Sequence, residues 1–146
     1  MIAYLDASAL VKRHIAEPGS KETIELAAAA EVVATSLVTR AEVAAALAKA
    51  VSAGLLSATD ARGAQRAFVR EWQDLARIPM TEALAARAES LVWSHALRGY
   101  DAVQLASALT WQESLGTPIT LATFDRQLWE AGRQAGLLTW PDTLDD

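Results

Sequence analysis

The stretch MIAYLDASAL, residues 1–10, decides the fold. Its apolar run, Ile2 to Leu5, has the length of a buried strand, and it ends on the carboxylate of Asp6. An ionised side chain at the edge of a core costs free energy unless a partner offsets its removal from water. A partner for this charge is therefore expected elsewhere in the chain.

The composition predicts one globular domain over residues 1–146. Hydrophobic residues make up 52% of the chain and charged residues 21%, which suits a domain with a sizeable core. The chain has no cysteine, so disulfides and thiolate metal sites are excluded, and a metal would be held by oxygen or imidazole ligands.

The charge pattern limits where the protein works and what it binds. Neither a signal peptide nor an uncharged run of membrane-spanning length is present, so we expect a cytoplasmic protein that binds no membrane. The net charge of -5 argues against capture of nucleic acid over a broad basic surface. Nucleic-acid chemistry would require a local basic rim or a bound cation.

Short apolar runs alternate with longer alanine-rich segments of helical period. This pattern predicts an α/β fold, a three-layer, doubly wound and mostly parallel sheet with helices on both faces. The predicted strands are Ala3–Asp6, Val32–Thr35, Ile78–Met80, Ile119–Ala122 and Leu138–Trp140. The predicted helices are Ala9–Ala16, Ser20–Ala30, Arg40–Ala53, Ala58–Arg77, Glu82–Ala96, Ala102–Leu115 and Arg126–Ala135.

Ligands of such a sheet bind beyond the carboxyl ends of the strands, where the strand order reverses. Asp6 ends the first strand, and the segment PITLATFD carries the fourth strand into Thr123 and Asp125. We expect the first and fourth strands to be neighbours, which would bring both carboxylates to one switch point.

Two further acids, Glu42 in TRAEV and Asp101 in LRGYDAVQLASAL, stand at the starts of predicted helices. Each has a structural alternative, because Thr39 to Glu42 matches a capping box, and Asp101 and Asp125 suit a helix N-terminus. Four clustered carboxylates, however, would repel one another unless they were protonated or bridged by a cation. A hard divalent ion, Mg²⁺ or Mn²⁺, would compensate them.

The segments YLDASAL, TRAEV, LRGYDAVQLASAL and LATFDRQL, in this order, resemble the four acidic motifs of the PIN-domain family, and of its short VapC-type toxin ribonucleases in particular. The resemblance covers nearly the whole chain. It implies a PIN-like nuclease domain, an Mg²⁺- or Mn²⁺-dependent endoribonuclease that is the toxin of a type II toxin-antitoxin system. The expected partners are an RNA substrate, a cognate antitoxin and a second copy in a homodimer.

The resemblance also implies roles for individual residues. Asp6 is the expected central metal ligand, Asp101 and Asp125 are co-ligands, and Glu42 is an outer ligand or orients the attacking water. Ser8 and Thr123 are expected as hydroxyl neighbours of the site.

Five basic residues lie within a few positions of these acids and are candidates for an RNA-binding rim, although solvated helix faces explain them nearly as well. They are Lys12, Arg13, Arg40, Arg98 and Arg126. Trp93, Trp111 and Trp129 fall within predicted helices, where core or dimer packing is expected.

The competing interpretation is a non-catalytic module that keeps the fold to bind nucleic acid or protein. A module that only binds RNA gains nothing from a negative pocket, which favours the nuclease. A haloacid-dehalogenase-type phosphatase would need an acid two residues after Asp6, where this chain has Ser8, and a response-regulator receiver would need a lysine in the last strands, where LLTWP has none.

Overall fold

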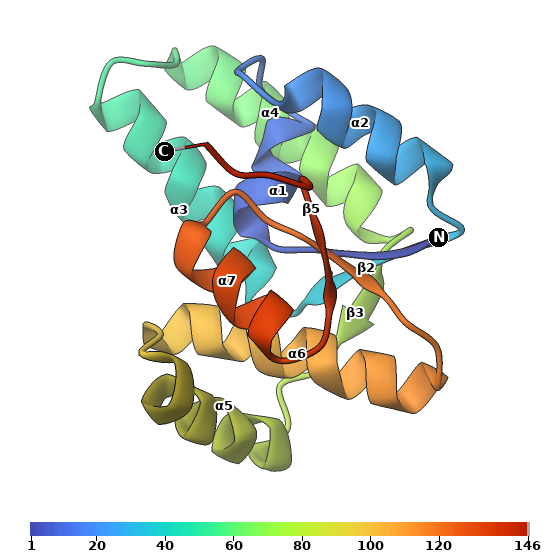
Figure 1. The fold of residues 1–146 in the computed structure, drawn as a ribbon. Coiled ribbons are helices and arrows are strands. Elements are labelled where there is room, and N and C mark those ends of the chain that lie inside the picture. Colours follow the sequence, from blue (N-terminus) through green and yellow to red (C-terminus); the bar gives the residue numbers. More distant parts are fainter. Residues whose placement is uncertain (146) are drawn as a thin grey trace.

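The first strand, β1 (Ile2–Leu5), lies at the centre of the sheet in the computed structural model, which describes residues 1–145 (Figure 1). Its residues Ala3, Tyr4 and Leu5 are fully buried because helices cover both faces. The described chain forms a five-stranded sheet in the order β3-β2-β1-β4-β5, and every neighbouring pair is parallel. The other strands are β2 (Val32–Ser36), β3 (Ala76–Ile78), β4 (Thr120–Ala122) and β5 (Leu138–Trp140).

Helices form a layer on each side of the sheet (Figure 1). The layer on the side of Ala3 and Leu5 consists of α1 (Ala7–Lys12), α2 (Ser20–Ala29), α3 (Thr39–Ser52) and α4 (Ala58–Trp72). The layer on the side of Tyr4 consists of α5 (Glu82–His95), α6 (Gly99–Leu115) and α7 (Arg126–Gln134). This arrangement confirms the predicted three-layer α/β fold.

Strands β1 and β4 are neighbours, as predicted, with Leu5 opposite Ala122. The chain winds from β1 outward to β2 and β3, and then crosses back to β4 and β5 on the other side of β1. The switch point therefore lies between the carboxyl ends of β1 and β4.

Close packing fixes the helix that follows β4. A Cβ atom on Gly132 of α7 would stand 2.7 Å from a methyl carbon of Leu121 in β4, so only glycine allows this approach. The C-terminal half of α7 is held against β4 in this way.

Some predicted boundaries were wrong. The first helix covers residues 7–12 rather than 9–16, because it begins directly at Asp6. The fourth helix ends at Trp72 rather than Arg77, and the third strand is Ala76–Ile78 rather than Ile78–Met80. Pro79 lacks a backbone donor and cannot extend the strand. The sixth helix begins at Gly99, three residues before its predicted start.

Within residues 1–145, none of the helices has the length and apolar character needed to cross a membrane.

Candidate active site

The switch point brings together the ends of four elements that carry acids. Asp6 follows β1 and caps α1 by accepting a hydrogen bond from the amide of Ala9 at 3.0 Å. Asp125 stands two residues after Thr123 and caps α7 by accepting from the amide of Leu128 at 2.9 Å. Glu42 and Asp101 lie in the first turns of α3 and α6.

Asp6 is the most deeply placed of these acids, with 5% of its surface exposed. The hydroxyl of Ser8 donates to its Oδ1 at 2.7 Å, and that of Thr123 donates to its Oδ2 at 2.8 Å. Burial raises the pKa of Asp6 to about 7 despite these hydrogen bonds, which favour the charged form, and the charge of Glu42 raises it further. The charge of Asp6 is thus offset by hydroxyls and one amide but by no cation within the described residues.

The same hydroxyls join the two loops at the switch point. The Ser8 hydroxyl accepts a hydrogen bond from the amide of Phe124 at 2.9 Å, and the Thr123 hydroxyl accepts one from the amide of Asp125 at 3.1 Å. The loop after β1 and the loop after β4 are therefore connected around one carboxylate.

Glu42 is oriented by Gln104, whose side-chain amide donates to Oε1 of Glu42 and to Oγ1 of Thr39, both at 2.8 Å. Burial raises the pKa of Glu42, the hydrogen bond from Gln104 opposes the shift, and the charge of Asp101 adds to it. The capping-box alternative for Glu42 is wrong: the N-cap of α3 is Val38, without a side-chain cap, and Glu42 turns toward Gln104 instead.

Asp101 and Asp125 share one guanidinium. Nε of Arg98 lies 3.2 Å from Oδ2 of Asp101, and Nη2 of Arg98 lies 3.4 Å from Oδ2 of Asp125. Burial and the charge of Asp125 raise the pKa of Asp101, whereas Arg98 lowers it.

The four acids form a chain of mutually repelling neighbours. The charge of Glu42 raises the pKa of Asp6, the charge of Asp101 raises that of Glu42, and the charge of Asp125 raises that of Asp101. Within residues 1–145, however, no three acidic or histidine side chains are arranged to hold a metal ion. The donor set itself consists of carboxylate and hydroxyl oxygens, which Mg²⁺ and Mn²⁺ prefer.

Most of the predicted basic rim is engaged within the protein. Lys12 binds Glu17 at 3.1 Å, Arg13 pairs with Glu71, Arg98 bridges two acids of the site, and Arg126 pairs with Glu130 and with the carbonyl of Leu144. Arg40 is exposed, and its guanidinium lies 5.9 Å from the ring centroid of Trp72. Trp72 is buried whereas Arg40 is exposed, so this cation–π contact lies where the packed side chains of α3 and α4 meet solvent.

Tyr4, Thr39 and Gln104 were missed in the sequence. Gln104 stands three residues after Asp101 on α6, so both side chains lie on one helical face. That spacing was the available signal for Gln104. The sequence carried no such signal for Tyr4, since a tyrosine in an apolar strand is expected to be an ordinary core residue.

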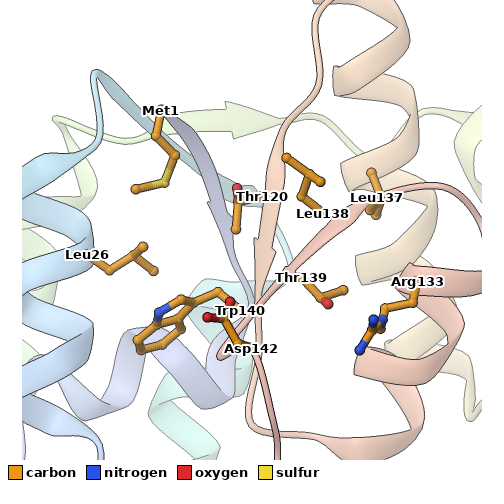
Figure 2. Close-up of a pocket in the computed structure, with 9 residues that line it drawn as sticks. All are labelled: Met1, Leu26, Thr120, Arg133, Leu137, Leu138, Thr139, Trp140 and Asp142. Carbon is orange, nitrogen blue, oxygen red and sulfur yellow. The ribbon is translucent and has the colours of Figure 1, made fainter.

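A hollow of about 550 Å³ lies elsewhere, along the open edge of the sheet at β5 (Figure 2). Figure 2 shows Leu26 and Trp140 on its α2 side and Arg133 on its α7 side. None of the four site acids lines it.

Comparison with known proteins agrees with the motifs. The family model of the PIN domain matches residues 3–134. The chain is 34% identical over 145 residues to Ribonuclease VapC49 of Mycobacterium tuberculosis, covering 99% of this chain and 98% of that protein.

Solved structures share the fold. The crystal structure of Mycobacterium tuberculosis VapC20, a Sarcin-Ricin loop cleaving toxin, superposes with a TM-score of 0.68 at 18% identity, over 93% of this chain and 96% of that one. A toxin-antitoxin complex from Klebsiella pneumoniae superposes with a TM-score of 0.59 at 20% identity, over 84% of this chain and 86% of that one.

Proposed function

Because this chain belongs to the PIN domain family, we propose that it is a divalent-metal-dependent endoribonuclease that hydrolyses RNA phosphodiester bonds and serves as the toxin of a toxin-antitoxin pair. The observation that carries the proposal is the linked set of Asp6, Glu42, Asp101 and Asp125 at the switch point of the sheet. The ribonuclease relative, aligned over nearly the full length, supports the choice of RNA as the substrate.

The residues present fit a hard divalent cation by the chemistry of their donors. Asp6 would be the central ligand, Asp101 and Asp125 would be co-ligands, and Glu42 would be an outer ligand or orient the attacking water. When bound, Mg²⁺ or Mn²⁺ would make a water nucleophilic near neutral pH and stabilise the charge of the phosphate and of the leaving oxygen.

The other groups of the site fix these carboxylates. Ser8 and Thr123 hold both oxygens of Asp6 in one orientation, and Gln104 holds one oxygen of Glu42. Burial raises the pKa of Asp6 to about 7, so ionising this carboxylate without a counterion costs free energy. A cation that neutralises the charge would offset that cost. The ribose 2′-hydroxyl has no part in this hydrolysis, so the products should carry 5′-phosphate and 3′-hydroxyl ends.

The test is cleavage of single-stranded and looped RNA with Mg²⁺, Mn²⁺ or EDTA, followed by mapping of the product ends. We expect cleavage only with a divalent cation and loss of cleavage in Asp6→Asn. Asp74→Asn, which changes an exposed acid away from the four site residues, is the matched control. Cyclic phosphate ends, or undiminished cleavage in EDTA, would overturn the mechanism. Binding of RNA without cleavage would favour the non-catalytic module.

The proposed antitoxin would inhibit by placing a basic side chain among the acids. Two of the carboxylates already pair with the guanidinium of Arg98, which supports a guanidinium as the inhibiting group. The Klebsiella toxin-antitoxin complex of the same fold supports a protein partner. An inhibited complex that bound Mn²⁺ as tightly as the free protein would contradict direct occlusion of the pocket.

We also propose a homodimer formed through α5 and α6. Trp93 is 86% exposed and Tyr100 is 64% exposed on these helices. Next to Tyr100 lies an almost wholly apolar groove of about 380 Å³, lined in part by Ala88, Val92 and Val103. Exposed aromatic side chains beside an apolar groove are typical of protein interfaces.

A further inference from the structure

Arg98 occupies a helix-start position that does not favour arginine. It is the N-cap residue of α6, and its side chain makes no cap hydrogen bond. N-cap positions favour Ser, Thr, Asp and Asn, whose oxygens accept from free amides. A cation near the positive end of a helix dipole is also unfavourable. The reason for an arginine here must lie in its other contacts.

Those contacts join two separate elements of the acidic pocket. Arg98 binds Oδ2 of Asp101 at 3.2 Å and Oδ2 of Asp125 at 3.4 Å. The Arg98 side chain is 76% exposed, whereas the Asp101 and Asp125 side chains are 12% and 26% exposed. The guanidinium therefore covers the two acids from the solvent side, and it can leave without disturbing the core.

The carboxylate oxygens that Arg98 engages are atoms that a metal ion would need. Two of the four acids, Asp101 and Asp125, point toward this guanidinium. No three acidic or histidine side chains of residues 1–145 are arranged to hold a metal ion. Arginine stays protonated at any ordinary pH, so it cannot release the acids by losing its charge. Only movement of the side chain frees them.

We propose that Arg98 is an internal counterion of the pocket, which neutralises Asp101 and Asp125 while no metal is bound and competes with the divalent cation for them. This inference rests on the proposed function and adds a residue that sets the metal affinity. Because the two cations compete for the same oxygens, contacts that stabilise the Arg98 bridge weaken metal binding, and bound metal weakens the bridge in turn.

The experiment measures Mn²⁺ binding to the full chain by calorimetry in Arg98→Gln, Arg98→Lys and wild type. We expect Arg98→Gln to bind Mn²⁺ more tightly by about two- to tenfold, the fold-change that corresponds to the loss of one or two exposed ion pairs. Arg98→Lys retains the charge and should fall between the two. Raised salt should reduce the difference, because exposed charges are screened within a few ångströms at about 1 M.

The matched control is Arg87→Gln, which removes the same charge from another bridge between helices, where Arg87 contacts Glu113 at 2.6 Å. It should bind Mn²⁺ as wild type does. If Arg98→Gln bound Mn²⁺ no more tightly than Arg87→Gln, the competition would be refuted. Weaker binding would also refute it and would show that Arg98 arranges the ligands instead.

These outcomes separate the inference from the proposed function. A wild-type protein that cleaves RNA with Mn²⁺ while Arg98→Gln has unchanged affinity would overturn the inference alone. A wild-type protein that binds no Mn²⁺ would overturn the inference together with the metal dependence proposed above.

Discussion

The phenolic hydroxyl of Tyr4 donates a hydrogen bond of 2.6 Å to the side-chain carbonyl of Gln104, 100 positions later in the chain. Tyr4 is fully buried at the centre of the sheet, and Gln104 is 1% exposed. Because the carbonyl end of Gln104 is occupied by Tyr4, its amide end must face Glu42 and Thr39. A core tyrosine thus determines how an acid of the site is held.

We predict that Gln104→Leu destabilises the protein and slows RNA cleavage. The substitution leaves the Tyr4 hydroxyl without its acceptor and Glu42 without its donor, a loss of about 1–3 kcal/mol for each unsatisfied buried group. Thermal melts and single-turnover cleavage measure the two effects. Tyr4→Phe should lower cleavage less, because the amide can still reach Glu42. Gln65→Leu, at an exposed position of α4, is the control, and equal behaviour of the two leucine variants would contradict the assigned role.

The stability of the metal-free protein should depend on pH through Asp6. Its folded pKa of about 7 lies above the ordinary value of 3.8, so the folded state binds the extra proton between these values. The free energy of unfolding that Asp6 contributes is therefore highest below about pH 3.8. It falls as the pH rises to about 7 and changes little above that pH. At about 1.4 kcal/mol per pKa unit, the penalty reaches about 4 kcal/mol.

Asp6→Asn removes this penalty. In EDTA at pH 8 we expect the variant to melt several degrees above wild type, since about 1 kcal/mol corresponds to about 2–4 °C in a domain of this size. Below about pH 4, where Asp6 is protonated in the folded and in the unfolded chain, the difference should nearly vanish. Asp74→Asn should show no such dependence. A variant that melts below wild type at pH 8 would mean that the Asp6 carboxylate holds the fold together.

Metal should shrink or reverse that difference in stability. Mg²⁺ at about 100 times its dissociation constant stabilises the folded protein by about 2.7 kcal/mol, and Asp6→Asn should lose most of this gain. Melting curves with increasing MgCl₂, each reversed by EDTA, test the prediction. Ca²⁺ at equal concentration controls for general screening of charge. Parallel responses of wild type and variant would argue against a site that includes Asp6.

The dimer prediction depends on Trp93. Trp93→Ser should convert the protein to a monomer in light scattering coupled to gel filtration, because it removes the most exposed aromatic side chain of the α5–α6 surface. Leu55→Ser changes an equally exposed apolar residue, 82% exposed, at the turn between α3 and α4 and should leave the dimer intact. A monomeric wild type, or loss of the dimer in the Leu55 variant alone, would contradict this interface.

The sequence predicted the sheet well because hydrophobic periodicity and the position of Asp6 act locally. The adjacency of β1 and β4 followed from the doubly wound pattern alone. The end of the fourth helix was missed because long-range packing decided it. Leu75 and Ile78 are buried in different clusters, so the chain leaves α4 early to enter β3.

The site was less predictable because side-chain directions depend on partners from distant segments. Asp125 makes the helix cap that the local pattern allowed, whereas Glu42 does not, since Gln104 of another helix competes for it. Charges near the acids were expected to form a rim toward solvent. Three of them, Lys12, Arg13 and Arg126, pair with acids outside the four site residues instead. The i,i+4 spacing of Arg126 and Glu130 was a local signal for one of these pairs, whereas Arg13 finds Glu71 on a distant helix, which no local pattern indicates.

The hydrogen bonds of Ser8 and Thr123 that join the two loops also determine at what stage of folding the four acids come together. Thr123 lies 117 positions after Asp6, and it reaches that carboxylate only once β4 has paired with β1. Contacts of such sequence separation form late, because the loop between them must close first. While the chain is being synthesised, its carboxyl-terminal segment emerges last, so an unfinished chain carries Asp6 without Thr123 or Asp125. The acidic site is therefore complete only after synthesis has passed Asp125 and β4 has paired with β1.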